Sequence, residues 1–196
     1  MTRVLVFLLA AALATPAMAA PITYVGLLTG PNEEPANASP GTGTALVTVD
    51  DVLHLLRVVV DFNGLFGTTT AAHIHVINGP GDLNTADTLG PVATTTPSFL
   101  GFPLGVTSGS MDQTYDLTLA SSFRGGFITD AGGIQQAESA LISALAEGRA
   151  YLNIHTNVFG GGEIRDFLAP EPAVPEPGGL LLLGMAGIGW YARSGR

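Results

Sequence analysis

The sequence contains no cysteine among its 196 residues. It also contains no lysine, and all seven residues of the Lys and Arg class are arginines. Without cysteine the chain cannot form a disulfide, an iron–sulfur cluster, a cysteine-ligated zinc site or a thiolate nucleophile. Its stability must therefore come from a packed core, and a chain of this length can bury one large enough.

Positive charge is scarce between the two ends of the chain. Residues 20–173 hold every acidic residue except Glu176 but only four basic ones, which are Arg57, Arg124, Arg149 and Arg165. The formal net charge of the whole chain is −9. Such a surface repels phosphate backbones, so we expect no nucleic-acid partner. Divalent cations, basic surfaces and neutral glycans stay open as partners, and the charge can also serve only to keep the protein soluble.

The first twenty residues, MTRVLVFLLAAALATPAMAA, have the layout of a secretory signal peptide. A basic start at Arg3 precedes an apolar run, which ends in the small-residue pattern Ala17-Met18-Ala19. The run is shorter than the roughly 20 residues that a membrane-spanning helix needs, which disfavours the alternative of a permanent anchor. The sequence therefore predicts a signal peptide at residues 1–19 and export from the cytoplasm.

The other end of the chain is also organised as a signal. Residues 169–177, APEPAVPEP, predict a proline-rich spacer that forms neither a helix nor a ladder strand. Residues 178–196 combine a short apolar helix with a basic end. Together with the motif Pro175, Glu176 and Pro177, this layout resembles the PEP-CTERM sorting signal of bacteria. The resemblance implies transient inner-membrane anchoring, cleavage by an exosortase and transfer to the cell surface or extracellular matrix, with permanent anchoring as the alternative.

Between the signals the pattern predicts a mainly β domain. Short runs rich in Val, Leu, Ile, Tyr and Thr, separated by Gly, Pro, Asn and Asp, are typical of an antiparallel sandwich or barrel; they lie at 21–28, 43–50, 52–62, 71–77, 115–120, 149–156 and 161–168. Asp50-Asp51 indicates a hairpin turn, and His54 is expected to be an ordinary strand residue. Residues 133–149 have helical spacing and predict one amphipathic helix that ends at Gly148.

Residues 79–110 form a long stretch rich in Gly, Pro and Thr with little periodicity. Loops of this length are often functional or mobile, so we expect any ligand contact here. The sequence has no phosphate-binding loop, no G-x-S-x-G elbow and no H-E-x-x-H motif, and we assign no catalytic residue.

Three segments line up in order with a known family. They are LTGPNEEPANASPGTGTALVTVD at 28–50, AAHIHVINGPGD at 71–82 and GRAYLNIHTNVFGGGEIRDFL at 148–168. Together they resemble the CHRD domain over residues 22–168. The resemblance implies an immunoglobulin-like antiparallel β-sandwich in an extracellular setting, and it implies no settled biochemical activity. Asp166 departs from the pattern, since many members have Gly after E-I-R.

Three of the four histidines fall in two of these segments. In a strand, residues two apart share a face, so His73 and His75 should point the same way, opposite to Ala72, Ile74 and Val76. The same rule places Asn153 and His155 on one face of their strand. If the two strands are neighbours, His73, His75 and His155 converge, and they would bind zinc or copper with one coordination position left free.

The alternative to a metal site is a structural network. A buried strand histidine commonly bonds a carboxylate or a backbone carbonyl. Glu163 and Arg165 share one face of the final strand and, with Asn153, could supply partners in a His–Glu–Arg cluster. Direct acid–base catalysis by the histidines is a third interpretation.

These observations favour an exported protein of the cell surface or extracellular matrix that binds or supports rather than catalyses. Its expected partners are an exosortase and exopolysaccharide or other matrix components. The alternative function is that of a zinc- or copper-binding protein, or a metalloenzyme, that uses the three histidines.

Overall fold

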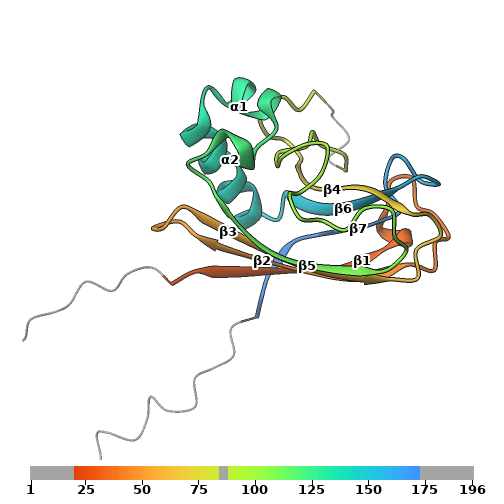
Figure 1. The fold of residues 1–196 in the computed structure, drawn as a ribbon. Helices are drawn as coiled ribbons and strands as arrows, with labels where there is room; N and C mark the ends of the chain where they lie inside the picture. Colours follow the sequence, from red (N-terminus) through yellow and green to blue (C-terminus); the bar gives the residue numbers. More distant parts are fainter. Residues whose placement is uncertain (1–19, 84–87, 173–196) are drawn as a thin grey trace, which may run out of the picture.

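The computed structural model describes residues 20–83 and 88–172 (Figure 1). Its strands are β1 (Ile22–Thr29), β2 (Thr42–Asp50), β3 (Leu55–Asn63), β4 (Thr69–Val76), β5 (Gly109–Asp116), β6 (Ala150–Thr156), β7 (Ile164–Phe167) and β8 (Ala169–Pro170). Its helices are α1 (Gly125–Ala131) and α2 (Ile134–Ala146), with 3-10 turns at Gly30–Asn32 and Ala120–Ser122. The predicted signal peptide at 1–19, the motif Pro175–Pro177 and the segment 178–196 lie outside the described residues. Across the described ranges, no helix has both the length and the apolar character needed to span a bilayer.

The strands form one antiparallel sheet in the order β4-β6-β7-β1-β2-β3-β5, and β8 pairs with β1. The sheet curls, so that β4, β6 and β7 form an upper layer over β1, β2, β3 and β5 (Figure 1). One hydrophobic core includes side chains from both layers. The prediction of a mainly β, antiparallel, sandwich-like fold is confirmed.

Alternation along the strands explains how the lower layer forms. In β3 the side chains of Leu56, Val58, Val60 and Phe62 are buried, while those between them are partly or fully exposed. β2 alternates in the same way, which fixes the register of the two strands. Each of these apolar side chains contributes roughly 1.5–3 kcal/mol by leaving water.

Both helices pack at one end of the sandwich, and only one of them was predicted. Helix α2 confirms the expected amphipathic helix: it buries Leu141 and Leu145 in the core, and Gly148 follows it with φ +68°. Helix α1 was missed because its seven residues include two glycines and give too short a pattern. Phe127 is the side chain that anchors α1 in the core.

His54 is not the ordinary strand residue that the sequence predicts. It ends the hairpin turn of residues 51–54, has φ +57°, and points its Nδ1 to Glu138 Oε1 on α2 at 2.8 Å. The Asp50 side chain forms the turn, since its Oδ1 accepts hydrogen bonds from the backbone N–H groups of Val52 and Leu53. The hairpin is therefore confirmed, but its turn is longer than the pattern indicated.

Two further expectations about strands were wrong. The run at 115–120 is not a strand: β5 ends at Asp116, whose carboxylate accepts the N–H and hydroxyl of Thr118 and turns the chain. The start of the proline-rich spacer does pair, because β8 lies beside β1 and Glu171 donates its N–H to the Thr23 carbonyl. Pro170 is tolerated there because a two-residue edge pairing needs few donors.

Candidate metal centre

The histidines come from two neighbouring strands. β4 and β6 pair antiparallel, with His73 opposite Asn153, His75 opposite Tyr151 and His155 opposite Ala71. The intervening apolar residues of both strands point into the core. The histidines therefore share the opposite face of these strands, as the alternation predicts.

The three imidazole rings meet at one spot. Ring centroids lie 5.7 Å apart for His73 and His75, 5.2 Å for His73 and His155, and 5.9 Å for His75 and His155. One nitrogen from each ring lies within 4.8 Å of the other two. His73 and His75 are buried and His155 is partly buried.

The outer nitrogen of each ring donates a hydrogen bond to a backbone carbonyl. His73 Nε2 lies 2.7 Å from the Pro97 oxygen, His75 Nδ1 lies 2.9 Å from the Gly90 oxygen, and His155 Nδ1 lies 3.0 Å from the Gly160 oxygen. A carbonyl can only accept, so these nitrogens carry the hydrogens of neutral rings. The lone pairs are then on His73 Nδ1, His75 Nε2 and His155 Nε2.

Those three inner nitrogens are buried, and none of them has a hydrogen-bond partner among the described residues. Buried polar atoms are normally paired, because an unpaired one costs about 1–3 kcal/mol. Three unpaired lone pairs directed at one spot, each ring oriented by a bond from its other nitrogen, is the arrangement that holds a metal ion.

Burial keeps the rings neutral at ordinary pH. Desolvation lowers the pKa of His73 to about 4 and that of His75 to about 3, only partly offset by the bonds to Pro97 and Gly90. Desolvation also lowers the pKa of His155. Neutral imidazole is the form that coordinates metals, so acid does not compete for these nitrogens at neutral pH.

Part of the long loop expected from the sequence covers this face. In this covering segment (residues 77–83 and 88–108), Ala93 and Phe99 donate their N–H groups to the Ile74 and Ala72 carbonyls of β4. The segment thus satisfies the free edge of β4 and brings the Gly90 and Pro97 carbonyls to the rings. Gly90 is required there, because a Cβ atom at this position would lie 2.1 Å from the Val76 oxygen.

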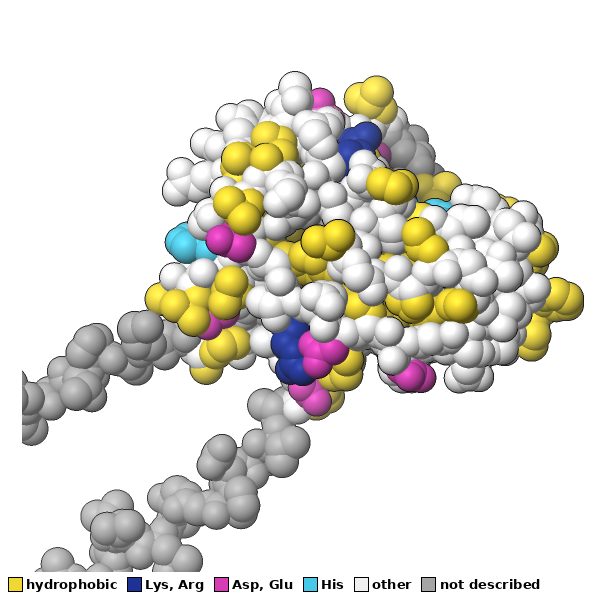
Figure 2. Space-filling view, in the orientation of Figure 1, with side chains coloured by type: hydrophobic (Ala, Val, Ile, Leu, Met, Phe, Trp, Pro, Cys, Tyr) yellow, Lys and Arg dark blue, Asp and Glu magenta, His cyan; other side chains and the backbone are white. Residues whose placement is uncertain are grey.

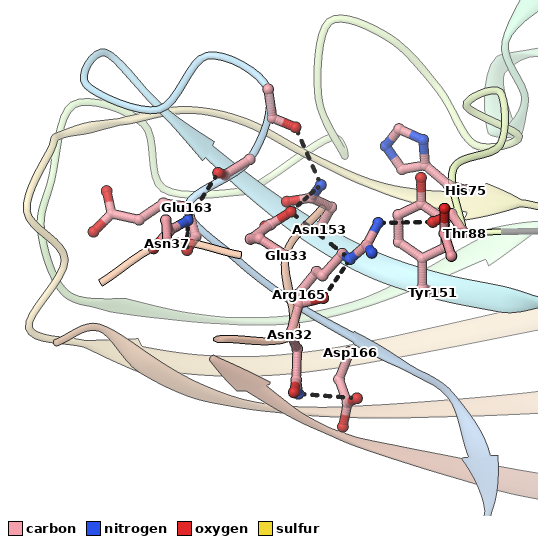
Figure 3. Close-up of polar contacts among 12 residues, drawn as sticks. Asn32, Glu33, Asn37, His75, Thr88, Tyr151, Asn153, Glu163, Arg165 and Asp166 are labelled. Carbon is pink, nitrogen blue, oxygen red and sulfur yellow. Dashed lines mark hydrogen bonds and ion pairs between the residues drawn. The ribbon is translucent and has the colours of Figure 1, made fainter. Parts of the chain in front are cut away.

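A polar network adjoins the histidines (Figure 3). Tyr151 stacks on His75, with ring centroids 4.8 Å apart, and the Arg165 guanidinium lies 4.8 Å from the centre of the Tyr151 ring. Arg165 donates to the Asn32 and Thr88 carbonyls. The predicted residues Asn153 and Arg165 therefore lie beside the cluster, but Arg165 reaches His75 only through Tyr151.

Glu33 belongs to this network and was missed by the sequence reasoning. Its Oε2 lies 3.8 Å from Arg165 Nε and accepts a 3.5 Å hydrogen bond from Asn153. Desolvation raises the pKa of Glu33 to about 7, and the Arg165 charge opposes that rise. The only signal for Glu33 was its place in the segment 28–50 that resembles the CHRD domain.

Glu163 has a different role from the one expected. Its carboxylate accepts hydrogen bonds from the hydroxyls of Ser39 and Thr156 and from the N–H groups of Phe66 and Gly67. The expected His–Glu–Arg cluster is not formed, because these four donors occupy Glu163 and the histidines bond carbonyls instead. Glu163 thus connects the loops that follow β1 and β3 to the end of β6.

A family model described as CHRD domain matches residues 24–168. No curated protein and no solved structure matches.

Proposed function

Because the chain belongs to the CHRD domain family, an extracellular module of unknown activity, we propose that this member binds one transition-metal ion, zinc or copper, through His73, His75 and His155. Imidazole suits both metals. The site residues would be His73 Nδ1, His75 Nε2 and His155 Nε2, and the ion would supply Lewis acidity or redox chemistry when bound.

The observation that supports the proposal most strongly is the convergence of three unpaired, buried lone pairs. Two zinc–nitrogen bonds of ~2.0–2.1 Å span at most about 4 Å. The three nitrogens lie within 4.8 Å of one another, so a bound ion would draw inward any pair that is farther apart than that span. The carbonyl partners of the outer nitrogens already fix each ring in the tautomer that coordination needs.

The burial of the site favours binding over turnover. Each inner nitrogen exposes less than 1 Å² to solvent. A metalloenzyme needs a coordination position that substrate can reach, so catalysis would require the covering segment to move. A metal-binding surface or matrix module therefore fits the geometry better than an oxidoreductase.

Metal content tests this proposal. The exported protein, purified without a histidine tag and dialysed against zinc or copper, should retain close to one equivalent. His73→Ala and His155→Ala should each lose it. His54→Gln is the matched control, because His54 lies in the β2–β3 turn and pairs with Glu138, and it should retain the metal. A wild-type protein without retained metal would overturn the proposal.

We also propose that the protein is exported through residues 1–19 and sorted to the cell surface by an exosortase acting near Pro175–Glu176–Pro177. Charged groups are sparse on the face in Figure 2, which is mostly neutral and scattered with apolar side chains. This surface supports contact with neutral exopolysaccharide rather than with a highly charged partner.

Mass spectrometry of the protein recovered from the surface of its host tests the sorting proposal. We expect an N-terminus close to residue 20 and a C-terminus close to the Pro175–Pro177 motif. Recovery of the intact tail from the inner membrane would show permanent anchoring instead.

A further inference from the structure

The histidine cluster offers a metal only neutral ligands. The second nitrogen of each ring bonds a backbone carbonyl, so no carboxylate lies directly behind the three rings in the described part of the chain. In metal sites that place is taken by a carboxylate, a backbone carbonyl or a water, and of these only a carboxylate brings a negative charge to share with the ion. The positive charge of a bound ion would therefore be shared only with the neutral imidazoles and would not be balanced by a carboxylate.

The charged group beside the aromatic stack of the cluster is a cation. The Arg165 guanidinium lies 4.8 Å from the centre of the Tyr151 ring, which stacks on His75, and a positive charge there disfavours further positive charge nearby. Glu33, an acid of the same network, is itself paired with Arg165. The network around the cluster thus supplies little negative charge to balance a dication.

Because the cluster is buried and has little negative charge around it, it should favour an ion of low charge. The Born cost of burying an ion scales with the square of its charge, so a dication costs about four times as much as a monocation of equal size. Histidine clusters that hold divalent ions offset that cost with carboxylates, hydroxide or solvent. Here the inner nitrogens each expose less than 1 Å².

The number of available ligands also favours a monovalent ion. Zinc in proteins is almost always four-coordinate, and with three protein ligands it takes a water as the fourth. Copper(II) prefers tetragonal sites with four or more ligands. Copper(I), a closed-shell monovalent ion, is stable with three nitrogen ligands and needs no water. The three sealed nitrogens match copper(I) in both number and charge.

From this geometry we infer that the His73–His75–His155 cluster selects copper(I) over divalent ions such as zinc(II). The inference rests on the proposed metal-binding function and specifies the ion. No redox step is required of the protein: it takes up copper already in the monovalent state.

Competition under anaerobic conditions tests the inference. Copper(I) is supplied to the exported, untagged protein from a chromophoric copper(I) chelator, and zinc(II) is supplied in a parallel titration against a zinc indicator. We expect the dissociation constant for copper(I) to be lower than that for zinc(II) by at least about tenfold. His73→Ala and His155→Ala should lose copper(I) binding, and His54→Gln should keep it.

The outcomes separate the inference from the proposal on which it rests. A smaller ratio, or tighter binding of zinc(II), overturns the copper(I) assignment and leaves the metal site standing. Binding of neither ion overturns both. X-ray absorption of the copper(I) protein gives a second readout: the spectrum of a three-coordinate nitrogen site is expected, and a four-coordinate site would contradict the inference.

Discussion

Tyr151 lies flat against His75, with an angle of 10° between the two rings, and it separates His75 from the Arg165 guanidinium. The phenol oxygen has long contacts to Gly90, at 3.3 and 3.5 Å, and it also interacts with the Arg165 side chain. None of these contacts reaches His75, so the ring, rather than the hydroxyl, packs against His75.

Replacing Tyr151 should separate these two contributions. Tyr151→Phe keeps the ring and should cost less than about 1.5 kcal/mol in the free energy of unfolding, with metal binding retained. Tyr151→Ala leaves a cavity beside His75 and should cost about 3–5 kcal/mol and weaken metal retention. Urea unfolding and metal analysis of both variants check this. Full metal affinity in a folded Tyr151→Ala protein would show that the stack does not position His75.

Glu163→Gln should destabilise the fold without removing the metal site. The amide would turn one hydrogen-bond donor toward groups that now donate to the carboxylate, at a cost of about 2–4 kcal/mol. The free energy of unfolding measures this loss. Because Glu163 does not bond the histidines, the folded variant should still retain the metal. Loss of metal from a fully folded variant would assign Glu163 to the site after all.

Metal-free protein should lose stability in mild acid. Unfolded histidines have a pKa near 6.5, while folding lowers the pKa of His73 to about 4 and that of His75 to about 3. Between these values the unfolded state binds more protons at the two histidines. This outweighs the opposite effect of Glu33, whose pKa folding raises to about 7, so the net stability falls as the pH drops from 6.5 toward 4. The melting temperature from pH 7 to pH 4 checks this. His75→Phe, which preserves a ring against Tyr151, should show a shallower fall.

The His54–Glu138 pair should have the opposite pH dependence. The bond to Glu138 raises the pKa of His54, so its contribution is present below the unfolded pKa of about 6.5 and is lost as the pH rises through the higher folded pKa. The melting temperatures of wild type and His54→Gln should differ at pH 6 and converge at pH 9. A difference that does not change with pH would mean that the pair acts as a neutral hydrogen bond.

The sequence was most informative where the signal is local. Period-two alternation predicted the strands and placed His73, His75 and His155 on one face, because alternation in a strand depends only on neighbouring residues. It could not identify the carbonyls of Gly90, Pro97 and Gly160, since every residue has a carbonyl and only the path of the chain selects which ones are used. Those carbonyls fix the tautomer of each ring, and the tautomers leave the inner nitrogens free to bind a metal.

The incorrect expectations about the site concern contacts between distant segments. Glu163 precedes β7 and Arg165 is the second residue of that strand, but most of their partners come from loops far away in the sequence. Glu33 enters the network through the turn after β1, and nothing in its local pattern indicates burial. The carboxylate of Asp166 accepts the Leu27 N–H and so links β7 to β1 through a side chain.

The most direct measurement is a crystal structure of the protein loaded with copper, with anomalous diffraction recorded on both sides of the copper absorption edge. The account predicts a single anomalous peak bonded to His73 Nδ1, His75 Nε2 and His155 Nε2, with the other three nitrogens still donating to their carbonyls. A peak elsewhere, a copper-free cluster, or coordination through the opposite nitrogens would contradict it.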